Sequence, residues 1–351
     1  MKIGMPLKYS GGIDETVEGL REFEDVGLDI VLLPEAYTFD SVSQLGYIAA
    51  RTSTVQIATS ILNIYSRTPT LLAMTAAGVD YVSGGRFVLG IGSSGVQVVE
   101  GFHGVKFDAP LGRTREVVEI CRQVWSGQRV EHSGRHYQVP LTEADGGTGL
   151  GKPLKLINTP LRSRIPIVLA ALGPKNVALA AELCEGWEPI FYLPERAGEV
   201  FGESLDQGRA KRAPELGELD VMVDTQLLIS EDADELAAGI AEVRAHLALY
   251  IGGMGAKGKN YYFNLASRYG FEAEAEQIQE LFLSGDRAAA AAAVPDALVH
   301  GVALIGAPGH VRERAAAFAE AGVTTLNVRP LAGAHARQVE DIGRLKEYVS
   351  G

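Results

Sequence analysis

The sequence contains little cysteine and tryptophan and no long uninterrupted apolar stretch. Its 351 residues include two cysteines, Cys121 and Cys184, and two tryptophans. Two cysteines exclude a disulfide scaffold and a zinc site built from several thiolates. No run approaches the roughly 18 apolar residues of a membrane-spanning helix, and the N-terminus lacks the apolar stretch of a signal peptide. We therefore expect a cytoplasmic protein.

Positive charge is also scarce. Lys and Arg together number 32 against 44 Asp and Glu, which gives a formal net charge of −12. A chain this acidic repels phosphate backbones, so general nucleic-acid binding is not expected. Hydrophobic residues make up 46% and charged residues 22% of the chain, which is typical of a globular enzyme and too apolar for disorder.

Common catalytic motifs are missing as well. The sequence has no G-x-S-x-G, no Walker loop and no H-E-x-x-H, which argues against the usual hydrolases, phosphotransferases and zinc proteases. His132 and His136 lie four residues apart without neighbouring acids or thiols in a metal-binding pattern. We interpret them as surface histidines and expect no metal site.

Apolar runs alternate with amphipathic helical patterns along most of the chain. The runs that predict strands are Met1–Leu7, Leu28–Leu33, Thr54–Leu62, Arg86–Ile91, Ile165–Leu172, Gly186–Phe191, Val221–Ile229 and Val323–Val328. Eight strands with helices between them predict an α/β fold of the TIM (β/α)8 barrel type. The alternative is an open doubly wound sheet, but the first turn, residues 8–14, lacks the G-x-G-x-x-G of dinucleotide-binding folds.

Two stretches break the alternation, and we interpret both as insertions in one domain that spans residues 1–351. The first, at about 129–160, begins with a predicted hairpin over 129–139 that turns at Ser133-Gly134, and a glycine-rich loop follows. The second, at about 251–300, is predicted to be irregular and partly helical.

The active site of a barrel lies at the carboxyl ends of its strands, so polar residues there are candidates. Glu35 follows the second strand and could act as a base or bind a cofactor ring, or could instead cap a helix. Asn63, Tyr65 and Arg67 follow the third strand, where they could form a binding loop; Arg67 could instead pair with a surface acid.

Two further segments offer candidates near the fourth strand. Gly92, Ser93 and Ser94 end that strand, and a glycine there could allow a flat ligand close to the backbone or serve a turn with positive φ. His103, a little further on, is a candidate proton donor.

The strongest anion-binding signal is Gly173-Pro174-Lys175-Asn176, which joins a predicted strand to a helix. A glycine turn followed by proline at the first helical position leaves backbone N–H groups at the positive end of the helix dipole. Lys175 opposes the dipole there, which an anion would explain. The alternative is an ordinary strand-to-helix turn.

Four long segments, taken in order, carry a family resemblance. They are Ser66–Gly95, LGRTREVVEICRQVW, ALGPKNVALAAELCEGW and APGHVRERAAAFAEAGVTTLNV. Together they resemble the bacterial-luciferase-like oxidoreductases, and most closely the branch that uses the deazaflavin coenzyme F420 in place of FMN. The resemblance covers nearly the whole chain and implies a TIM barrel with a flavin-type ring in its mouth.

The resemblance also implies roles for individual residues. The third strand of the family usually ends in a bulge with a non-proline cis peptide behind the ring, and the matching bond here is Ser60-Ile61. The other matches are Asn63 and Arg67 with contacts to the ring and its tail, Gly92-Ser93-Ser94 with the strand-four edge, and Gly173-Pro174-Lys175-Asn176 with the phosphate-binding turn.

The chain departs from the deazaflavin branch at two points. Many members place Asp-His after strand two, where this chain has Glu35-Ala36. Sugar-phosphate dehydrogenases of the group carry a Glu soon after the strand-four glycines, where this chain has Val96. Glucose-6-phosphate oxidation is therefore not expected, and Glu35, His103 or a bound substrate is left to handle protons.

The leading functional hypothesis is a coenzyme F420-dependent oxidoreductase that transfers a hydride between the deazaflavin and a small organic substrate. A second hypothesis is an FMN-dependent monooxygenase that uses O₂ and a partner reductase. A third is a catalytically silent cofactor-binding protein on the same barrel. The family resemblance also leads us to expect a homodimer, and the sequence does not identify the substrate.

Overall fold

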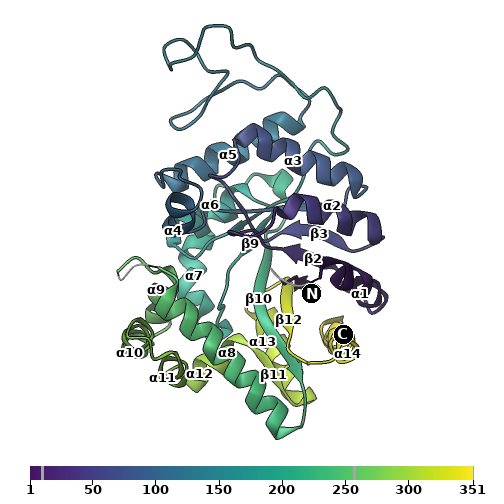
Figure 1. Cartoon of the computed structure of the whole chain (residues 1–351), viewed down its shortest axis with the longest axis vertical. Helices are drawn as coiled ribbons and strands as arrows, with labels where there is room; N and C mark the ends of the chain where they lie inside the picture. The colour runs from purple at the N-terminus through teal and green to yellow at the C-terminus, as the bar shows by residue number, and fades with distance from the viewer. Residues whose placement is uncertain (9–11, 256–257, 351) are drawn as a thin grey trace.

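The computed structural model describes residues 1–8, 12–255 and 258–350, and this part of the chain forms a closed parallel barrel surrounded by helices (Figure 1). The barrel strands are β1 (Lys2–Pro6), β2 (Ile30–Leu33), β3 (Gln56–Thr59), β5 (Phe87–Gly92), β8 (Ile167–Ala170), β9 (Gly186–Glu188), β10 (Asp220–Ile229) and β12 (Thr325–Pro330). Each pairs in parallel with the next, and β12 pairs with β1 to close the ring. The predicted TIM barrel and its eight strands are confirmed.

The helices cover the outside of the barrel with their apolar faces inward. Between strands they are α1 (Ile13–Asp25), α2 (Ser41–Arg51), α3 (Pro69–Val82), α5 (Pro110–Trp125), α6 (Pro174–Leu183), α7 (Pro194–Arg209), α8 (Ala233–Gly253), α13 (Pro308–Glu320) and the last helix α14 (His335–Ser350); a 3-10 turn covers Pro214–Leu216. Helix α1, for example, buries Val17, Leu20 and Phe23 at helical spacing. None of the helices in the described part of the chain has the length and apolar character needed to span a bilayer.

The third strand differs from its prediction as one continuous run. The structure divides it into β3 and the short β4 (Leu62–Asn63), and the peptide bond Ser60-Ile61 between them is cis. Strand β4 pairs with β5 on its own, with Asn63 opposite Gly92. A further difference is the helix α4 (Val96–Gly101) just after β5, which the sequence analysis did not predict.

The first insertion is a hairpin followed by a long loop, which stands off the barrel at the top of Figure 1. Its strands are β6 (His132–Ser133) and β7 (Gln138–Val139), so the turn covers residues 134–137 and the predicted turn at Ser133-Gly134 was one to two residues early. The Glu116 carboxylate of α5 holds this turn, because it accepts the backbone N–H groups of Arg135, His136 and Tyr137 at 2.8–3.1 Å.

The second insertion is more regular than predicted. It contains the helices α9 (Tyr261–Arg268), α10 (Glu272–Leu283), α11 (Arg287–Ala292) and α12 (Asp296–Val302), and they pack against α8 (Figure 1). The strand β11 (Leu304–Gly306), also unpredicted, then pairs with the carboxyl end of β10.

Candidate active site

Two of the polar candidates, Glu35 after the second strand and Arg67 after the third, form an ion pair at the barrel mouth. Arg67 Nη1 and Nη2 bind the Glu35 carboxylate at 2.5 and 3.0 Å, and Nη2 also binds Asp40 at 2.8 Å. The Arg67 and Glu35 side chains are only 13% and 10% exposed. Burial raises the pKa of Glu35, but the bonds from Arg67 and Ser41 outweigh it, so the pKa lies below its usual range. A carboxylate held in this way is a weak proton acceptor, and the catalytic role predicted for Glu35 stays a prediction.

The segment around the cis bond is fixed by neighbouring strands. The Ser60 hydroxyl donates to Glu188 of β9 at 2.8 Å, and the Ile61 side chain occupies the space above Gly92, where a Cβ would overlap its terminal methyl group. Gly90 is just as restricted, because a Cβ there would overlap the Thr59 carbonyl oxygen. Glycine is therefore required at positions 90 and 92 because other atoms of the protein lie too close for a Cβ. The turn with positive φ that the sequence suggested for this segment lies at Ser94.

Asn63 carries an unused hydrogen-bond donor into this site. Its side-chain oxygen accepts the Tyr65 N–H at 2.8 Å, while its Nδ2 atom is buried and lacks a partner among the described residues. A buried donor without a partner costs about 1–3 kcal/mol, so a ligand acceptor at this position would be favoured. This observation fits the predicted contact between Asn63 and a flavin-type ring.

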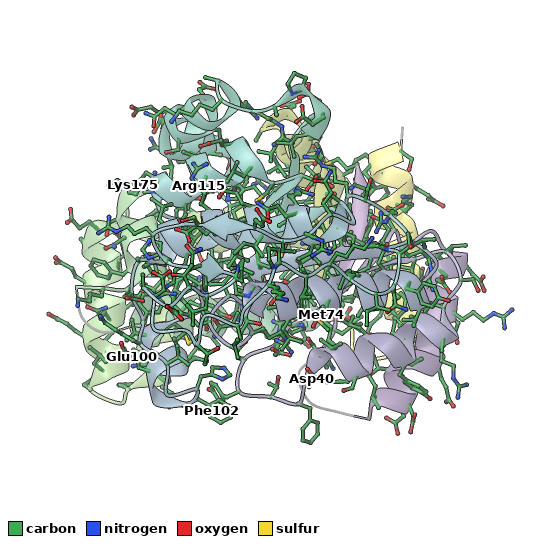
Figure 2. All side chains as sticks on the ribbon, turned by 90° about the horizontal axis from the view of Figure 1, so that it is seen from above. Asp40, Met74, Glu100, Phe102, Arg115 and Lys175 are labelled. Atoms are coloured by element: carbon green, nitrogen blue, oxygen red, sulfur yellow. The ribbon has the colours of Figure 1, made fainter. Side chains whose placement is uncertain are left out.

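Exposed aromatic side chains border the mouth. Tyr37 follows β2 and is 69% exposed; Phe102 follows α4 and is 64% exposed; their ring centroids lie 6.1 Å apart. Phe102 lies at the same edge of the molecule as Asp40 in Figure 2. His103 packs its ring against Phe102 at a centroid distance of 5.3 Å, so it lies at this rim, and its predicted role as proton donor is untested.

The predicted phosphate-binding turn forms the N-terminus of α6. Gly173 is the N-cap residue, without a capping side chain, and a Cβ built on it would meet only open space. Pro174 has no N–H and the Asn176 N–H bonds back to the Gly173 carbonyl, so in the described chain the Gly173 and Lys175 amides are the ones left for a ligand. Lys175 is exposed beside this turn (Figure 2).

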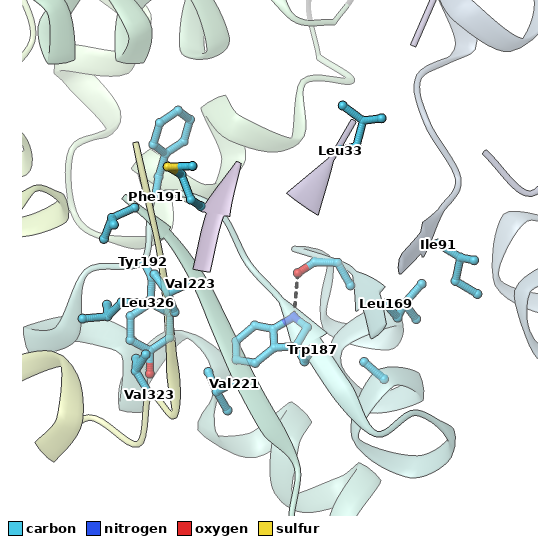
Figure 3. Packing of buried hydrophobic residues seen from close by; sticks show 14 of the residues in the cluster. Leu33, Ile91, Leu169, Trp187, Phe191, Tyr192, Val221, Val223, Val323 and Leu326 are labelled. Carbon is cyan, nitrogen blue, oxygen red and sulfur yellow. Dashed lines mark hydrogen bonds between the residues drawn. The ribbon is translucent and has the colours of Figure 1, made fainter. Parts of the chain in front are cut away.

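Two side chains hold the carbonyls that precede this turn. Trp187 of β9 donates its Nε1–H to the Ala171 carbonyl at 2.8 Å (dashed line in Figure 3). The Trp187 ring packs against Phe201. Arg268 of α9 donates to the Leu172 carbonyl at 3.3 Å. These bonds fix the carbonyls of the two residues that precede Gly173, and a site that positions an anion needs such support.

Sequence analysis missed a group of polar residues inside the barrel. Glu188 of β9 and Asn327 of β12 are buried, and Asp224 of β10 is half-buried. Asn327 Nδ2 donates to Glu188 at 3.3 Å. They could have been predicted from the pattern of an acidic or amide residue within an otherwise apolar strand. Such a residue must face either the barrel interior or the surrounding helices, because side chains alternate along a strand. The described residues contain no group of three or more His, Cys, Asp or Glu placed to hold a metal ion.

The chain matches the model of the luciferase-like monooxygenase family over residues 1–325. It belongs to this family of oxidoreductases. A protein of Mycobacterium tuberculosis named "Putative coenzyme F420-dependent oxidoreductase Rv3520c" is 43% identical over 98% of this chain and 99% of its own length. The 5,10-methylenetetrahydromethanopterin reductase of Archaeoglobus fulgidus is 29% identical over 86% of this chain and 85% of its own.

A solved structure shares the fold. The coenzyme F420-dependent tetrahydromethanopterin reductase of Methanopyrus kandleri superposes with a TM-score of 0.77 at 23% identity, covering 97% of both chains. The family model and the mycobacterial relative confirm the family resemblance drawn from the sequence.

Proposed function

We propose that this chain is a coenzyme F420-dependent oxidoreductase that transfers a hydride between the deazaflavin and a small organic substrate. The free donor in the barrel mouth is evidence for a flavin-type ring. The similarity to the mycobacterial relative along nearly the whole chain favours the deazaflavin over FMN. The structural observation that carries the proposal is the buried, unpartnered Nδ2 donor of Asn63 beside the cis Ser60-Ile61 bond.

The residues of the mouth have distinct tasks in this proposal. Ser60, Ile61 and Gly92 form the wall behind the ring, and Asn63 donates to an acceptor on its edge. Gly173, Lys175 and Asn176 at the start of α6 bind the phosphodiester of the tail. Bound F420 supplies the hydride chemistry, while the protein orients the ring and substrate and excludes water.

In this proposal Glu35 and Arg67 at the rim hold the neighbouring loop in place rather than transfer protons. Arg67 stays bound to Glu35 and Asp40, and this network fixes the loop that follows β4 beside the cofactor tail. Tyr37 and Phe102 provide apolar surface over the open side of the mouth, where they shield the reacting atoms from water.

The test of this proposal is a pair of titrations of the purified protein with oxidised F420 and with FMN, each followed by the fluorescence of the cofactor. We expect F420 to be quenched with a Kd in the micromolar range or below, and FMN to bind at least about tenfold more weakly, a difference of about 1.4 kcal/mol. Binding of FMN without F420 would favour the monooxygenase hypothesis, and binding of neither would refute both.

We further propose that the protein forms homodimers. Helix α3 exposes the apolar side chains of Leu71, Met74, Tyr81 and Val82, each between 46% and 71% exposed. An exposed apolar face on one helix is typical of an interface. Light scattering on the eluting protein should give the mass of two chains, and the mass of a single chain at micromolar concentration would contradict this proposal.

A further inference from the structure

The polar residues inside the barrel form one layer directly above its apolar filling. Ile30, Leu32, Ala58, Val88, Val168 and Met222 make up a separate apolar cluster. Ser60 and Asp224 lie two residues beyond Ala58 and Met222, so they share the inward face of their strands and lie closer to the carboxyl ends. Glu188 pairs in register with Ala170, two residues beyond Val168. The layer therefore lies between the apolar filling and the mouth.

Hydrogen bonds connect three members of this layer, Ser60, Glu188 and Asn327. Glu188 Oε1 accepts from Ser60 Oγ at 2.8 Å and from Asn327 Nδ2 at 3.3 Å. Asp224 is the register partner of Asn327 on the adjoining strand, and its negative charge acts on Glu188. On the next strand, Gly4 leaves room for this cluster, because a Cβ there would overlap Asn327 Oδ1.

The cluster has more acceptors than donors. Glu188 Oε2, Asp224 Oδ1 and Asn327 Oδ1 are buried and lack a partner among the described residues. If both carboxyl groups were ionised, three acceptors and two negative charges would lie together without a donor to satisfy them. One added proton converts one of these oxygens into a donor, which removes one unsatisfied acceptor and one of the two charges.

We propose that Glu188 and Asp224 share one proton at neutral pH, and that this pair, with Ser60 as its relay, is the acid–base group of the active site. The pair would take the place of the histidine that the deazaflavin branch usually carries after strand two. The identity of the group with which it exchanges the proton rests on the proposed function; the shared proton itself does not.

Electrostatics supports the shared proton. Burial and the neighbouring charge of Asp224 raise the pKa of Glu188 well above its usual range, against the lowering effect of the Ser60 bond. Burial raises the pKa of Asp224 to about 7. The nearest cation along the adjoining strand, Arg329, is bound to Glu242 at 2.9 Å, and in the described chain neither member of the pair has an ion-pair partner.

Exposure defines the path of the proton. Glu188 is 5% and Asn327 0% exposed, whereas Ser60 and Asp224 are only half-buried. In the structure the Ser60 hydroxyl donates to Glu188 Oε1, so in the transfer it first turns its own proton toward a base at the mouth. The Glu188 O–H bond then breaks as its proton passes to Ser60 Oγ, and the Ser60 O–H proton passes to that base. The pair is left as two carboxylates, and the reverse transfer restores it. No oxidation or reduction accompanies this step.

The shared proton can be observed in the protein without cofactor. We expect the infrared carbonyl band of a protonated carboxyl group to persist at about pH 7, where ordinary carboxyl groups are ionised. The double variant E188Q/D224N should lose this band. The control D341N removes another buried carboxyl group, whose pKa is raised to about 6 by burial, and should leave the band of the pair in place. A neutral-pH band of equal size in wild type and double variant would overturn the shared proton.

Stability gives a second measurement in case the infrared bands overlap. Because both folded pKa values are raised, the native state binds protons that the unfolded chain releases, so stability should fall as pH rises from the ordinary carboxyl range through about 7. D224N, which resembles the protonated form, should flatten this fall in Tm. An unchanged pH profile of Tm in D224N would contradict the proposal.

The relay is tested by S60A in the same infrared measurement on the protein without cofactor. Because the Ser60 hydroxyl bonds to Glu188 Oε1, its removal should shift the frequency of the carbonyl band. S60T, which keeps the hydroxyl group, should restore the wild-type frequency. An unshifted band in S60A would refute the link between Ser60 and the pair. Failure of the wild type to bind F420 would refute the proposed function and leave the infrared result unaffected.

Discussion

The substitution G173D is expected to abolish F420 binding while leaving the fold intact. Gly173 has φ −73° and ψ 143°, which any residue can adopt, and its Cβ would point into open space. Aspartate is a better N-cap than glycine by a few tenths of a kcal/mol, so the Tm should stay the same or rise slightly. The new carboxylate would occupy the anion site and repel the phosphodiester. We expect a loss of at least about 100-fold in affinity, or about 2.7 kcal/mol.

The matched control for this experiment is G173N. Asparagine caps the helix as well as aspartate and has a similar size, but it carries no charge. G173N fills the same space as G173D but does not repel the phosphodiester, so it should lose clearly less affinity, and the difference between the two variants isolates the charge. Equal affinity in wild type, G173N and G173D, measured by fluorescence titration, would show that the tail does not bind at α6.

The substitution G90A is expected to cause a large loss of stability. Gly90 and Thr59 are joined by two hydrogen bonds, from the Gly90 N–H to Thr59 Oγ1 at 2.9 Å and from Thr59 Oγ1 to the Gly90 carbonyl at 2.8 Å. An alanine Cβ would overlap the Thr59 carbonyl oxygen, which is backbone and cannot move without separating β3 from β5. We expect a loss of about 3 kcal/mol or more in the free energy of unfolding, measured by urea denaturation.

Gly95 supplies the control for this prediction. It lies at the end of the same segment, it has φ −106°, and a Cβ there would meet nothing within 4 Å. Gly95 is the N-cap residue of α4, where alanine caps less well than glycine, so G95A should lose no more than about 1 kcal/mol in the free energy of unfolding. A loss in G90A no greater than the loss in G95A would mean that the close approach of β3 and β5 is not what requires glycine.

The barrel could be predicted from the sequence because its strands are buried on both faces. The run Leu28–Leu33 contains the fully buried strand β2, and the proline that opens α6 marks a helix start. The break between β3 and β4 could not be read from periodicity, because Thr54–Leu62 contains no glycine or proline that would interrupt a strand. Only the family resemblance pointed to Ser60-Ile61. The helices α9 to α12 were predicted only as an irregular, partly helical stretch, because these short helices are stabilised by packing against α8 and against one another.

The candidate site was predictable only in part, since a sequence does not show which polar residues bind each other. Glu35 and Arg67 were both placed at the mouth, but their ion pair depends on two loops that are 32 residues apart in the chain. The acidic layer was missed for the opposite reason. Glu188 and Asp224 lie in otherwise apolar strands. The apolar pattern identifies such strands as core, but it does not show which of their side chains face the interior of the barrel.

The most direct test of this account is the structure of the protein in complex with oxidised F420. We predict that the deazaflavin ring lies against Ser60 and Ile61 with an acceptor atom on Asn63 Nδ2, and that the first phosphate of the tail contacts the N-terminus of α6 at Gly173. A ring bound elsewhere, or a complex in which Asn63 Nδ2 and the α6 amides stay without contact to the coenzyme, would contradict it.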